Sequence, residues 1–334
     1  MPAKAKASVS PLRKWIMNLL KISVTGGILY YLYSRGMLDF SRVHGVLTDI
    51  PVVTVTFTIF ILAQIAGVIR WRWLLQGQDL NLQFGEALQL TMIGVFFNTA
   101  IPGAVSGDVV KGYYVVSKQP DGRGRIKAFT TLLLDRLLGL SALVFVSFFA
   151  MVFNRESISS VPALKPLCGL ITMLTLGVVA FFSFVLIPTP LSRIVQELLP
   201  RLPLGGLLAK FFDAVKSYED CKGLMVKGFL ISICIHLGII TAFMLLSRSL
   251  GGFTEVPAAK FFFLIPFGLL VTAIPIAPAG LGTGHYAFFK FFGFVGASGG
   301  ADLFTLFVTF QIIMSLIGGL FYLRYRGHAP TIEQ

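Results

Sequence analysis

Four ionisable side chains stand inside apolar stretches of this sequence. Asp108 and Lys111 lie three residues apart in the segment GVFFNTAIPGAVSGDVVKGYY, and Asp135 and Arg136 are neighbours in LLLDRLLGL. Charged groups in such surroundings are costly, and by default they indicate a functional site. A guanidinium and an ammonium bind phosphate oxygens, and a carboxylate can act as a general base. Recognition of a phosphate group is the chemistry that we expect first from this set.

The pairing of these charges can be anticipated from helix geometry. Asp135 and Arg136 point in different directions because they are adjacent on a helix, whereas Asp108 and Lys111 share a face. We therefore expect Asp108 to pair with Arg136. Two alternatives remain open: a structural ion pair between Asp108 and Lys111, and direct contact of Arg136 with a phosphate through its planar fork.

The segment that carries Asp108 is broken at Ile101-Pro102-Gly103. Proline removes a backbone donor and clashes with the preceding turn, so the helix is expected to stop and restart there. The first amides of the restarted helix suit a phosphate oxygen, and Ser106 or Asp108 is available as a cap. The candidate binding residues of this segment are Asn98, Pro102, Gly103, Ser106, Asp108 and Lys111.

A second interrupted segment, PIAPAGLGTGHYAFFKFF from Pro275 to Phe292, repeats this pattern. Its glycines let backbone approach a ligand closely, and His285 and Lys290 add polar groups. The alternating glycines superficially resemble a nucleotide loop, but no strand precedes them, so that signal is negligible. The candidate binding residues here are Pro278, Gly280, Gly282, His285 and Lys290.

Arg70 and Arg72 in IRWRWLL alternate with Trp71 and Trp73 near the end of an apolar run. Aromatic and basic residues together are typical of an anchor at a membrane interface. The alternative interpretation is a place where a charged headgroup enters. His236, inside another apolar run, is interpreted as a core residue with satisfied hydrogen bonds.

No catalytic constellation accompanies these residues. The sequence contains no HExxH, nucleophile elbow or GxxxxGK[ST] pattern. Its four histidines are scattered, and Cys168, Cys221 and Cys234 show neither paired spacing nor matching His spacing, which argues against a metal centre and a disulfide framework. We expect no catalytic residue, no metal and no cofactor.

Composition indicates what kind of chain must position these charges. Hydrophobic residues make up 55% of 334 positions and charged residues 13%, against roughly 25% charged in an ordinary soluble domain. The net charge of +13 is carried by short groups of Lys and Arg at the ends of apolar runs, which indicates membrane topology and anionic headgroups, with no nucleic acid partner. The chain is therefore predicted to be an all-α polytopic membrane protein and not a soluble enzyme.

Six apolar runs are long enough to cross a bilayer as helices. They are 15–34, 52–75, 128–153, 165–188, 228–247 and 303–323. The two interrupted stretches, 86–116 and 261–293, should each form a re-entrant hairpin of two half-helices. We expect one integral membrane domain over 1–334, with a basic N-terminus at 1–14 and an amphipathic segment at 190–227 that lies either at the membrane surface or packed on the protein.

Charge distribution tests this path, because cytoplasmic loops collect Lys and Arg. With six spans and two hairpins that return to their own side, eighteen Lys and Arg residues fall on one side and six on the other. The richer side, which holds both termini and the 190–227 segment, is assigned to the cytoplasm. The hairpins then enter from opposite faces, as expected for an inverted repeat that is inferred from topology and the broken helices alone.

The motifs RWRWLL, FFNTAIPGAVSGDVVKGYY, LLLDRLLGL and PAGLGTGHYAFF, in this order and spacing, resemble those of the lysylphosphatidylglycerol synthase transmembrane domain family, also called the flippase-like domain family. The resemblance covers nearly the whole chain. Two positions depart from the family pattern: Ser106-Gly107-Asp108 replaces the usual Gly-Gly-Asp, and His285 stands where a glutamate is frequent. The second change removes a carboxylate and is consistent with a different substrate.

The resemblance implies movement of a polar-headed lipid between the leaflets of the cytoplasmic (inner) membrane. The expected ligands are phospholipids or polyprenyl-linked lipids with an anionic or modified headgroup. The aminoacyl-phosphatidylglycerol synthases of this family carry a soluble aminoacyltransferase domain, which we expect this chain to lack because it ends at Gln334. A separate lipid-modifying enzyme is then a candidate partner, and so is a second copy of the chain in a homodimer.

Two hypotheses from other classes stay open beside a lipid translocase. One is a membrane-embedded transferase that modifies a lipid, with Asp108 or Asp135 as general base. The other is a non-transporting scaffold for a partner enzyme, which predicts that the embedded charges tolerate replacement.

Overall fold

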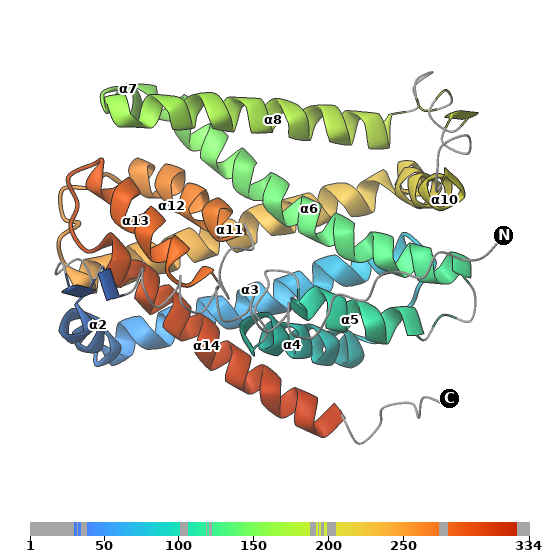
Figure 1. Ribbon diagram of the computed structural model, residues 1–334, viewed down its shortest axis with the longest axis horizontal. Coiled ribbons are helices and arrows are strands. Elements are labelled where there is room, and N and C mark those ends of the chain that lie inside the picture. The colour runs from blue at the N-terminus through green and yellow to red at the C-terminus, as the bar shows by residue number, and fades with distance from the viewer. Residues whose placement is uncertain are drawn as a thin grey trace.

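The computed structural model describes residues 39–100, 106–117, 119, 122–187, 205–273 and 280–325, together with single positions within 30–34 and 192–198. This described part of the chain is helical and contains no strand (Figure 1). The all-α prediction is confirmed. The predicted N-terminal segment 1–14 lies outside the described residues, as does almost all of the predicted first span, 15–34.

Five described helices are long and apolar enough to cross a membrane. They are α3 (Ile50–Gln76), α6 (Gly122–Phe153), α8 (Lys165–Leu186, preceded by the 3-10 turn Pro162–Leu164), α11 (Lys222–Leu250) and α14 (Gly300–Tyr325). Each matches one of the spans predicted after the first, with ends that differ by a few residues. The chain is a multi-pass membrane protein.

The two interrupted stretches form hairpins of short helices. The first consists of α4 (Phe84–Ala100) and α5 (Ser106–Ser117), and the second of α12 (Ala258–Thr272) and α13 (Thr283–Gly293), each pair packed together. The proline-containing breaks at 101–105 and 274–279 lie outside the described residues. Figure 1 shows the two pairs towards opposite ends of the molecule. Entry of the hairpins into the membrane from opposite faces stays a prediction.

The remaining helices are short and lie towards the ends of the long ones. They are α2 (Phe40–Leu47), α7 (Arg155–Ser159), α10 (Gly205–Lys216) and the 3-10 turn η3 (Ser217–Glu219). We call the end where α3 ends and α6 and α11 begin the basic end, because Arg123, Arg125, Lys222 and Lys227 gather there.

The amphipathic segment predicted at 190–227 is described from residue 205 onward and at single positions within 192–198. Its helix, α10, packs against α6 and α8, and the Tyr218 ring that follows is fully buried with its hydroxyl donating to the Leu74 carbonyl oxygen at 2.6 Å. Burial raises the pKa of this phenol above its usual value. Of the two predicted alternatives, α10 therefore adopts the one in which the segment packs on the rest of the protein. The boundary at 227 is wrong because α11 already begins at Lys222.

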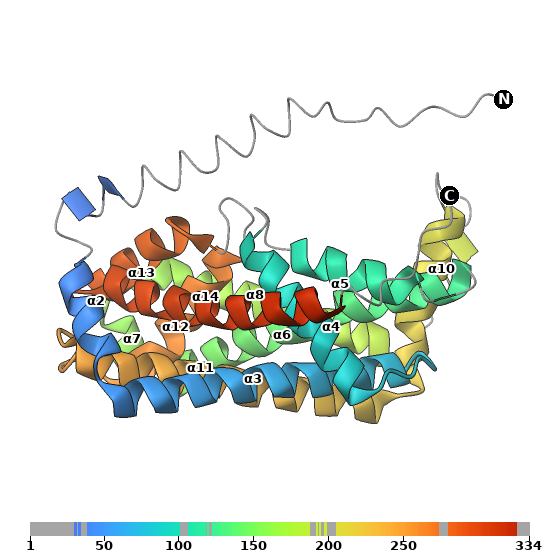
Figure 2. The same cartoon turned by 90° about the horizontal axis from the view of Figure 1, so that it is seen from below.

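Two successive sets of four helices share one order: a long helix, a hairpin and a second long helix. The first set runs from α3 to α6 and the second from α11 to α14. α3 packs along α11, and each hairpin packs against the last helix of the other set, α4 on α14 and α12 on α6. Figure 2 shows α5 and α13 along one side of the molecule and α3 and α11 along the other. This reciprocal packing is the inverted-repeat arrangement that the broken helices predicted.

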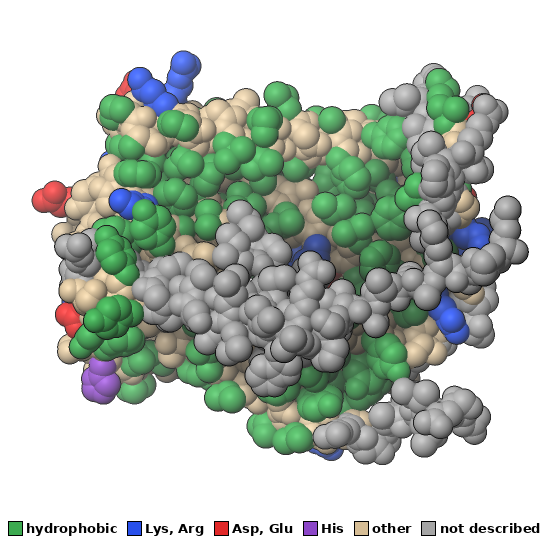
Figure 3. Space-filling model, viewed as in Figure 1, with side chains coloured by type: hydrophobic (Ala, Val, Ile, Leu, Met, Phe, Trp, Pro, Cys, Tyr) green, Lys and Arg blue, Asp and Glu red, His purple; other side chains and the backbone are tan. Residues whose placement is uncertain are grey.

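Aromatic rings and small residues hold the two sets together. The Phe60 ring of α3 stacks with Phe310 of α14, at 5.4 Å between centroids. Gly318 of α14 lies so close to α4 that a Cβ there would overlap the Met92 carbonyl oxygen, an approach typical of helices packed inside a bilayer. Figure 3 shows hydrophobic side chains over most of the described surface of one face, with many of the charged side chains towards the ends. Such a surface suits a lipid environment.

Candidate functional site

Asp108 lies in the first turn of α5, and Arg136 lies in the middle of α6. Arg136 Nε donates a hydrogen bond to Asp108 Oδ2, and the two side chains form an ion pair. The Arg136 side chain is 46% exposed, and that of Asp108 is 19% exposed. The expected pair is present. Within the described part of the chain only Nε of this guanidinium has a hydrogen-bond partner.

Asp135, the neighbour of Arg136, turns towards α3. Arg70 Nε donates to Asp135 Oδ1 at 2.7 Å, and Arg70 Nη1 donates to Ser232 Oγ on α11 at 2.9 Å. Only 12% of the Arg70 side chain and 15% of the Asp135 side chain are exposed. Gly139 of α6 leaves room for the guanidinium, since a Cβ there would lie 3.4 Å from Arg70 Nη1. The pair therefore joins three long helices in the interior.

The sequence left two interpretations of Arg70 open, an interfacial anchor and a headgroup-entry role, and neither included its pairing with Asp135. α3 continues to Gln76, and Trp71 is fully buried. Arg72 lies closer to the basic end, where its Nε donates to the Leu82 carbonyl oxygen at 3.0 Å and its guanidinium lies 5.9 Å from the Phe84 ring centroid. The anchor interpretation is wrong for Arg70, because the helix extends past it and supplies a buried carboxylate as its partner. Headgroup entry at either arginine stays a prediction.

Lys111 is a buried cation beside these pairs, with only 5% of the residue exposed. Its ammonium lies 3.5 Å from the centroid of the Trp71 ring, a cation–π contact. It also interacts electrostatically with Asp135 and Asp108. Ion pairs in the described part of the chain include none between Asp108 and Lys111, so the alternative pairing considered from the sequence is not the one adopted.

We call these five side chains the charged cluster: Arg70, Asp108, Lys111, Asp135 and Arg136. Three cations and two carboxylates leave it with one net positive charge. Unpaired charge in apolar surroundings costs several kcal/mol, so a cluster of this kind favours an added anion. No group of three or more His, Cys, Asp or Glu side chains suited to a metal ion occurs among the described residues.

The start of α5 was expected to present free amides to a phosphate. Gly107 N–H instead donates to Asn98 Oδ1 of α4 at 2.8 Å. Gly107 also lies against α4 so closely that a Cβ would overlap the Gly94 carbonyl oxygen. Asn98 thus ties the two arms of the hairpin together and occupies one expected anion donor. Pro102 and Gly103 lie outside the described residues, and the Ser106 side chain is likewise not described.

His236 and His285 are both satisfied by protein groups. His285 Nδ1 accepts from Gly282 N–H at 3.2 Å, and its Nε2 lies 3.1 Å from Thr305 Oγ1. His236 Nε2 lies 2.9 Å from the Gly139 carbonyl oxygen, as expected for a core residue. His285 caps the start of α13 and joins it to α14, which is a structural role.

Two glycines of the second hairpin are required by the backbone conformation at their positions. Gly280 and Gly282 adopt φ of 70° and 79°, a left-handed region that favours glycine. Lys290, by contrast, is exposed on α13, with its ammonium 5.6 Å from the Tyr286 ring centroid. Pro278 lies outside the described residues. Of the candidates in this hairpin, Lys290 is the cation that faces outward.

Sequence reasoning missed a polar cavity at the basic end of the first hairpin. The cavity, of about 300 Å³, is lined by Tyr113, Val116 and Ser117 of α5 and Arg125 of α6. Arg125 lies about three helical turns, roughly 16 Å, from Arg136 on the same face of α6. The two arginines are thus placed along one side of the helix. Their spacing was the available signal, but the charges near Arg125 were used only for topology.

Comparison with known proteins decides the family. A family model described as the lysylphosphatidylglycerol synthase TM region matches residues 18–321. The chain belongs to this family. The matched region therefore includes α3, α5 and α6, which carry the charged cluster. It also includes α4 and α11, which pack against them.

One curated relative is a UPF0104 membrane protein of Pyrococcus horikoshii, 26% identical over 106 residues. The match covers 31% of this chain and 31% of the relative, so the chain spans about a third of the curated relative it matches. No solved structure matches the chain.

In this member of the lysylphosphatidylglycerol synthase TM region family, the two hairpins share a short pattern at equivalent places. Ser106-Gly107-Asp108 opens α5, and Thr283-Gly284-His285 opens α13, each three residues after Gly103 or Gly280. The third residue of each triplet contacts the following long helix: Asp108 contacts Arg136, and His285 contacts Thr305. The repeat therefore holds a charged pair in its first half and a neutral pair in its second.

Proposed function

We propose that this protein is a lipid translocase that moves a lipid with an anionic headgroup between the leaflets of a membrane. The substrate class is a phospholipid or a polyprenyl-linked lipid whose phosphate binds the charged cluster. The observation that carries the proposal is the excess positive charge of the cluster, placed in the middle of apolar helices, with Arg136 half exposed to the surroundings.

The arrangement of the hairpins supports movement across the membrane. α4–α5 and α12–α13 enter from opposite ends and occupy equivalent places in an inverted repeat, an architecture that recurs in transporters with alternating access. Arg125 and Tyr113 lie at the basic end of the molecule, where they line the cavity of about 300 Å³. Lys290 lies on α13, towards the opposite end. A headgroup would meet basic side chains at both ends and in the middle.

Charge bias supports an orientation. We place the basic end on the cytoplasmic side of the inner membrane, with both termini on that side, because Lys and Arg concentrate in cytoplasmic loops. A phosphate on that leaflet would then reach the Arg125 cavity before the charged cluster.

The ion pairing of the carboxylates disfavours a transferase. A general base needs a lone pair free to take a proton from the reacting group. Asp108 is paired with Arg136 through Oδ2 and Asp135 with Arg70 through Oδ1, so each carboxylate already has a structural partner, although its second oxygen could still accept a proton. Chemistry on the lipid therefore has less support than its movement.

A leaflet-asymmetry assay tests the proposal. Purified protein is placed in vesicles that contain headgroup-labelled phosphatidylglycerol, phosphatidylethanolamine or a polyprenyl phosphate, and a membrane-impermeant quencher reports label in the outer leaflet. We expect faster movement of an anionic lipid with the wild type and loss of that movement with Arg136→Ala. Arg123→Ala removes an exposed arginine from the end of the same helix and serves as the matched control.

Three results would count against a translocase. Unchanged lipid distribution with every label would contradict it, and so would equal rates for wild type and Arg136→Ala. Mass spectrometry of the recovered lipid provides the third test, because a covalently altered headgroup would favour the transferase instead.

A further inference from the structure

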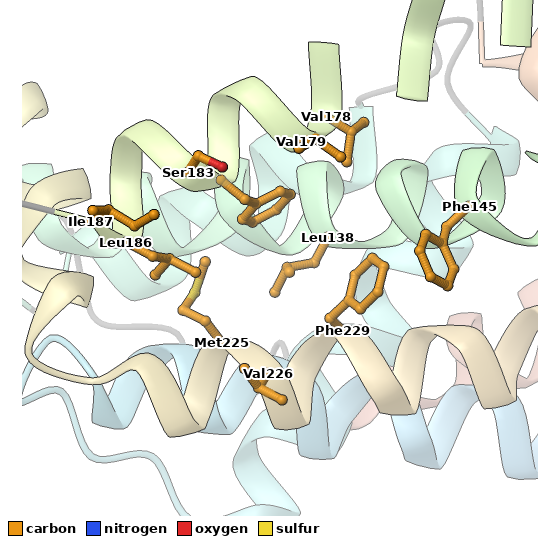
Figure 4. A pocket seen from close by; sticks show the side chains of 11 residues that line it. Leu138, Phe145, Val178, Val179, Ser183, Leu186, Ile187, Met225, Val226 and Phe229 are labelled. Carbon is orange, nitrogen blue, oxygen red and sulfur yellow. The ribbon is translucent and has the colours of Figure 1, made fainter. Parts of the chain in front are cut away.

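A groove runs between α8 and α11, with α6 as its floor. Its volume is about 390 Å³, and its lining is apolar except for Ser183. Figure 4 shows side chains from both helices facing the same space, among them Val179 and Leu186 of α8 and Val226 and Phe229 of α11. A groove of this volume lies in the range of sites that hold one small ligand.

The groove opens away from the protein. Val179 is 55% exposed and Val226 is 52% exposed, whereas Leu138 on the floor is fully buried. α8 and α11 are both long and apolar enough to cross the membrane, so the opening faces hydrocarbon. Empty space against these side chains would lose dispersion contacts, and a flexible hydrocarbon chain from the bilayer restores them.

Lysine side chains lie near the end of the groove that reaches the basic end. Lys222 and Lys227 are exposed on α11 and flank Met225 and Val226, both of which line the groove. Lys222 lies one turn before these two residues and so shares their face. On the α8 side, Lys216 Nζ donates to the carbonyl oxygen of Ile187 at 2.9 Å. An anionic phosphate at this end would meet Lys222 while its chain lies along the groove.

We propose that this groove is a binding site for one acyl chain of an anionic phospholipid, whose phosphate contacts Lys222. The site is distinct from the charged cluster, because none of the five cluster residues lines the groove. The bound lipid fills the space between α8 and the rest of the bundle and holds α8 in place. This inference does not depend on lipid translocation.

Photo-crosslinking tests the site. The full chain is placed in nanodiscs containing phosphatidylglycerol with a diazirine in one acyl chain, and labelled residues are mapped by mass spectrometry. We expect labelling concentrated on Phe182, Val226 and Phe229, with at least a fivefold loss in Val226→Trp, because an indole would fill the opening. Leu230→Trp, which alters an exposed residue of α11 outside the groove, should leave the labelling unchanged.

The headgroup is tested in the same preparation. A Lys222→Gln variant should lower groove labelling by phosphatidylglycerol to the level given by a phosphatidylcholine probe, and Lys227→Gln, on another face of α11, is the matched control. Val179→Trp, from the opposite wall, replaces Val226→Trp if that variant does not elute as a single species.

Two outcomes would overturn the inference. Even labelling of exposed residues such as Met173 and Leu176 of α8 would mean surrounding lipid without a site. Groove labelling that is equal for both headgroups and unaffected by Lys222→Gln would overturn the anionic assignment. Neither outcome bears on translocation, which is read from leaflet asymmetry.

Discussion

Arg136 Nε of α6 is hydrogen-bonded to Asp108 at the start of α5, while 46% of the Arg136 side chain is exposed. One arginine therefore holds the hairpin to a long helix and is accessible to a ligand at the same time. A phosphate that binds there competes with Asp108 for a single guanidinium. The strength of this pair should set how firmly a headgroup is held.

Asp108→Asn should tighten headgroup binding and slow its release. The substitution keeps the shape of the side chain but removes the negative charge that competes with phosphate, and loss of one charge-assisted hydrogen bond corresponds to about 1.5–3 kcal/mol, or roughly tenfold or more in affinity. Binding is measured by lipid titration in detergent, and movement by leaflet asymmetry. Asp79→Asn, an exposed carboxylate, is the control. Unaltered binding in Asp108→Asn would show that the headgroup does not compete at Arg136.

Asp135→Leu should strongly destabilise the protein, because it leaves Arg70 buried without its counter-ion. Breaking one partner of a buried pair costs about 3–5 kcal/mol. The double variant Arg70→Met/Asp135→Leu should recover most of that loss, since apolar residues of similar size replace the pair. The stabilities of the two variants are compared by heating them in detergent and recording the temperature at which each aggregates. If the double variant were as unstable as Asp135→Leu alone, the single-variant loss would come from packing and not from charge.

The sequence predicted the helical architecture well because apolar length and proline breaks are local signals. Five spans and both hairpins lie within a few residues of their predicted bounds. Asp108–Arg136 was also predictable, because adjacent charges on a helix cannot pair with each other and few other partners were available.

Other parts of the site depend on packing that a single sequence does not specify. Arg70 belongs to a motif typical of interfaces, and only the continuation of α3 to Gln76 and the position of α6 place it against Asp135. Asn98 and Gly107 meet across a break, so their hydrogen bond depends on how closely α4 and α5 approach. His285 was expected to bind a ligand, but the fold surrounds it with Gly282 and Thr305.

Gly107→Ala should disrupt the first hairpin. A Cβ at this position would overlap the backbone of Gly94, and backbone cannot move aside as a flexible side chain does. We expect a loss of at least 1–3 kcal/mol, typical of overpacking, together with loss of lipid movement, because α5 carries Asp108 and Lys111. Thermal stability and leaflet asymmetry are measured on the same sample.

Gly85→Ala provides the matched control for this variant. Gly85 lies in α4 of the same hairpin, and a Cβ there would have no neighbour within 4 Å. Its stability should equal or slightly exceed that of the wild type. Equal behaviour of the two variants would mean that α4 and α5 do not approach as closely as the structure has them.

Lys111→Met should change which headgroup is moved. Lys111 supplies the excess positive charge of the cluster, so its removal leaves two cations and two carboxylates, a neutral set. Methionine retains much of the length and apolar contact of the lysine stem against Trp71, although the cation–π contact, worth about 0.5–2 kcal/mol, is lost. We expect movement of anionic lipid to fall at least tenfold while movement of zwitterionic lipid is unchanged or increases.

The measurement is leaflet asymmetry with phosphatidylglycerol and phosphatidylethanolamine in parallel, and Lys127→Met is the control. Lys127 lies on α6 at the basic end and pairs with Asp79 at 3.3 Å, so its loss changes net charge equally without touching the cluster. Equal loss of both lipids in Lys111→Met would point to a structural role for the ammonium. Selective loss of the anionic lipid would instead show that the net charge of the cluster, and not the charge of the whole protein, chooses the substrate.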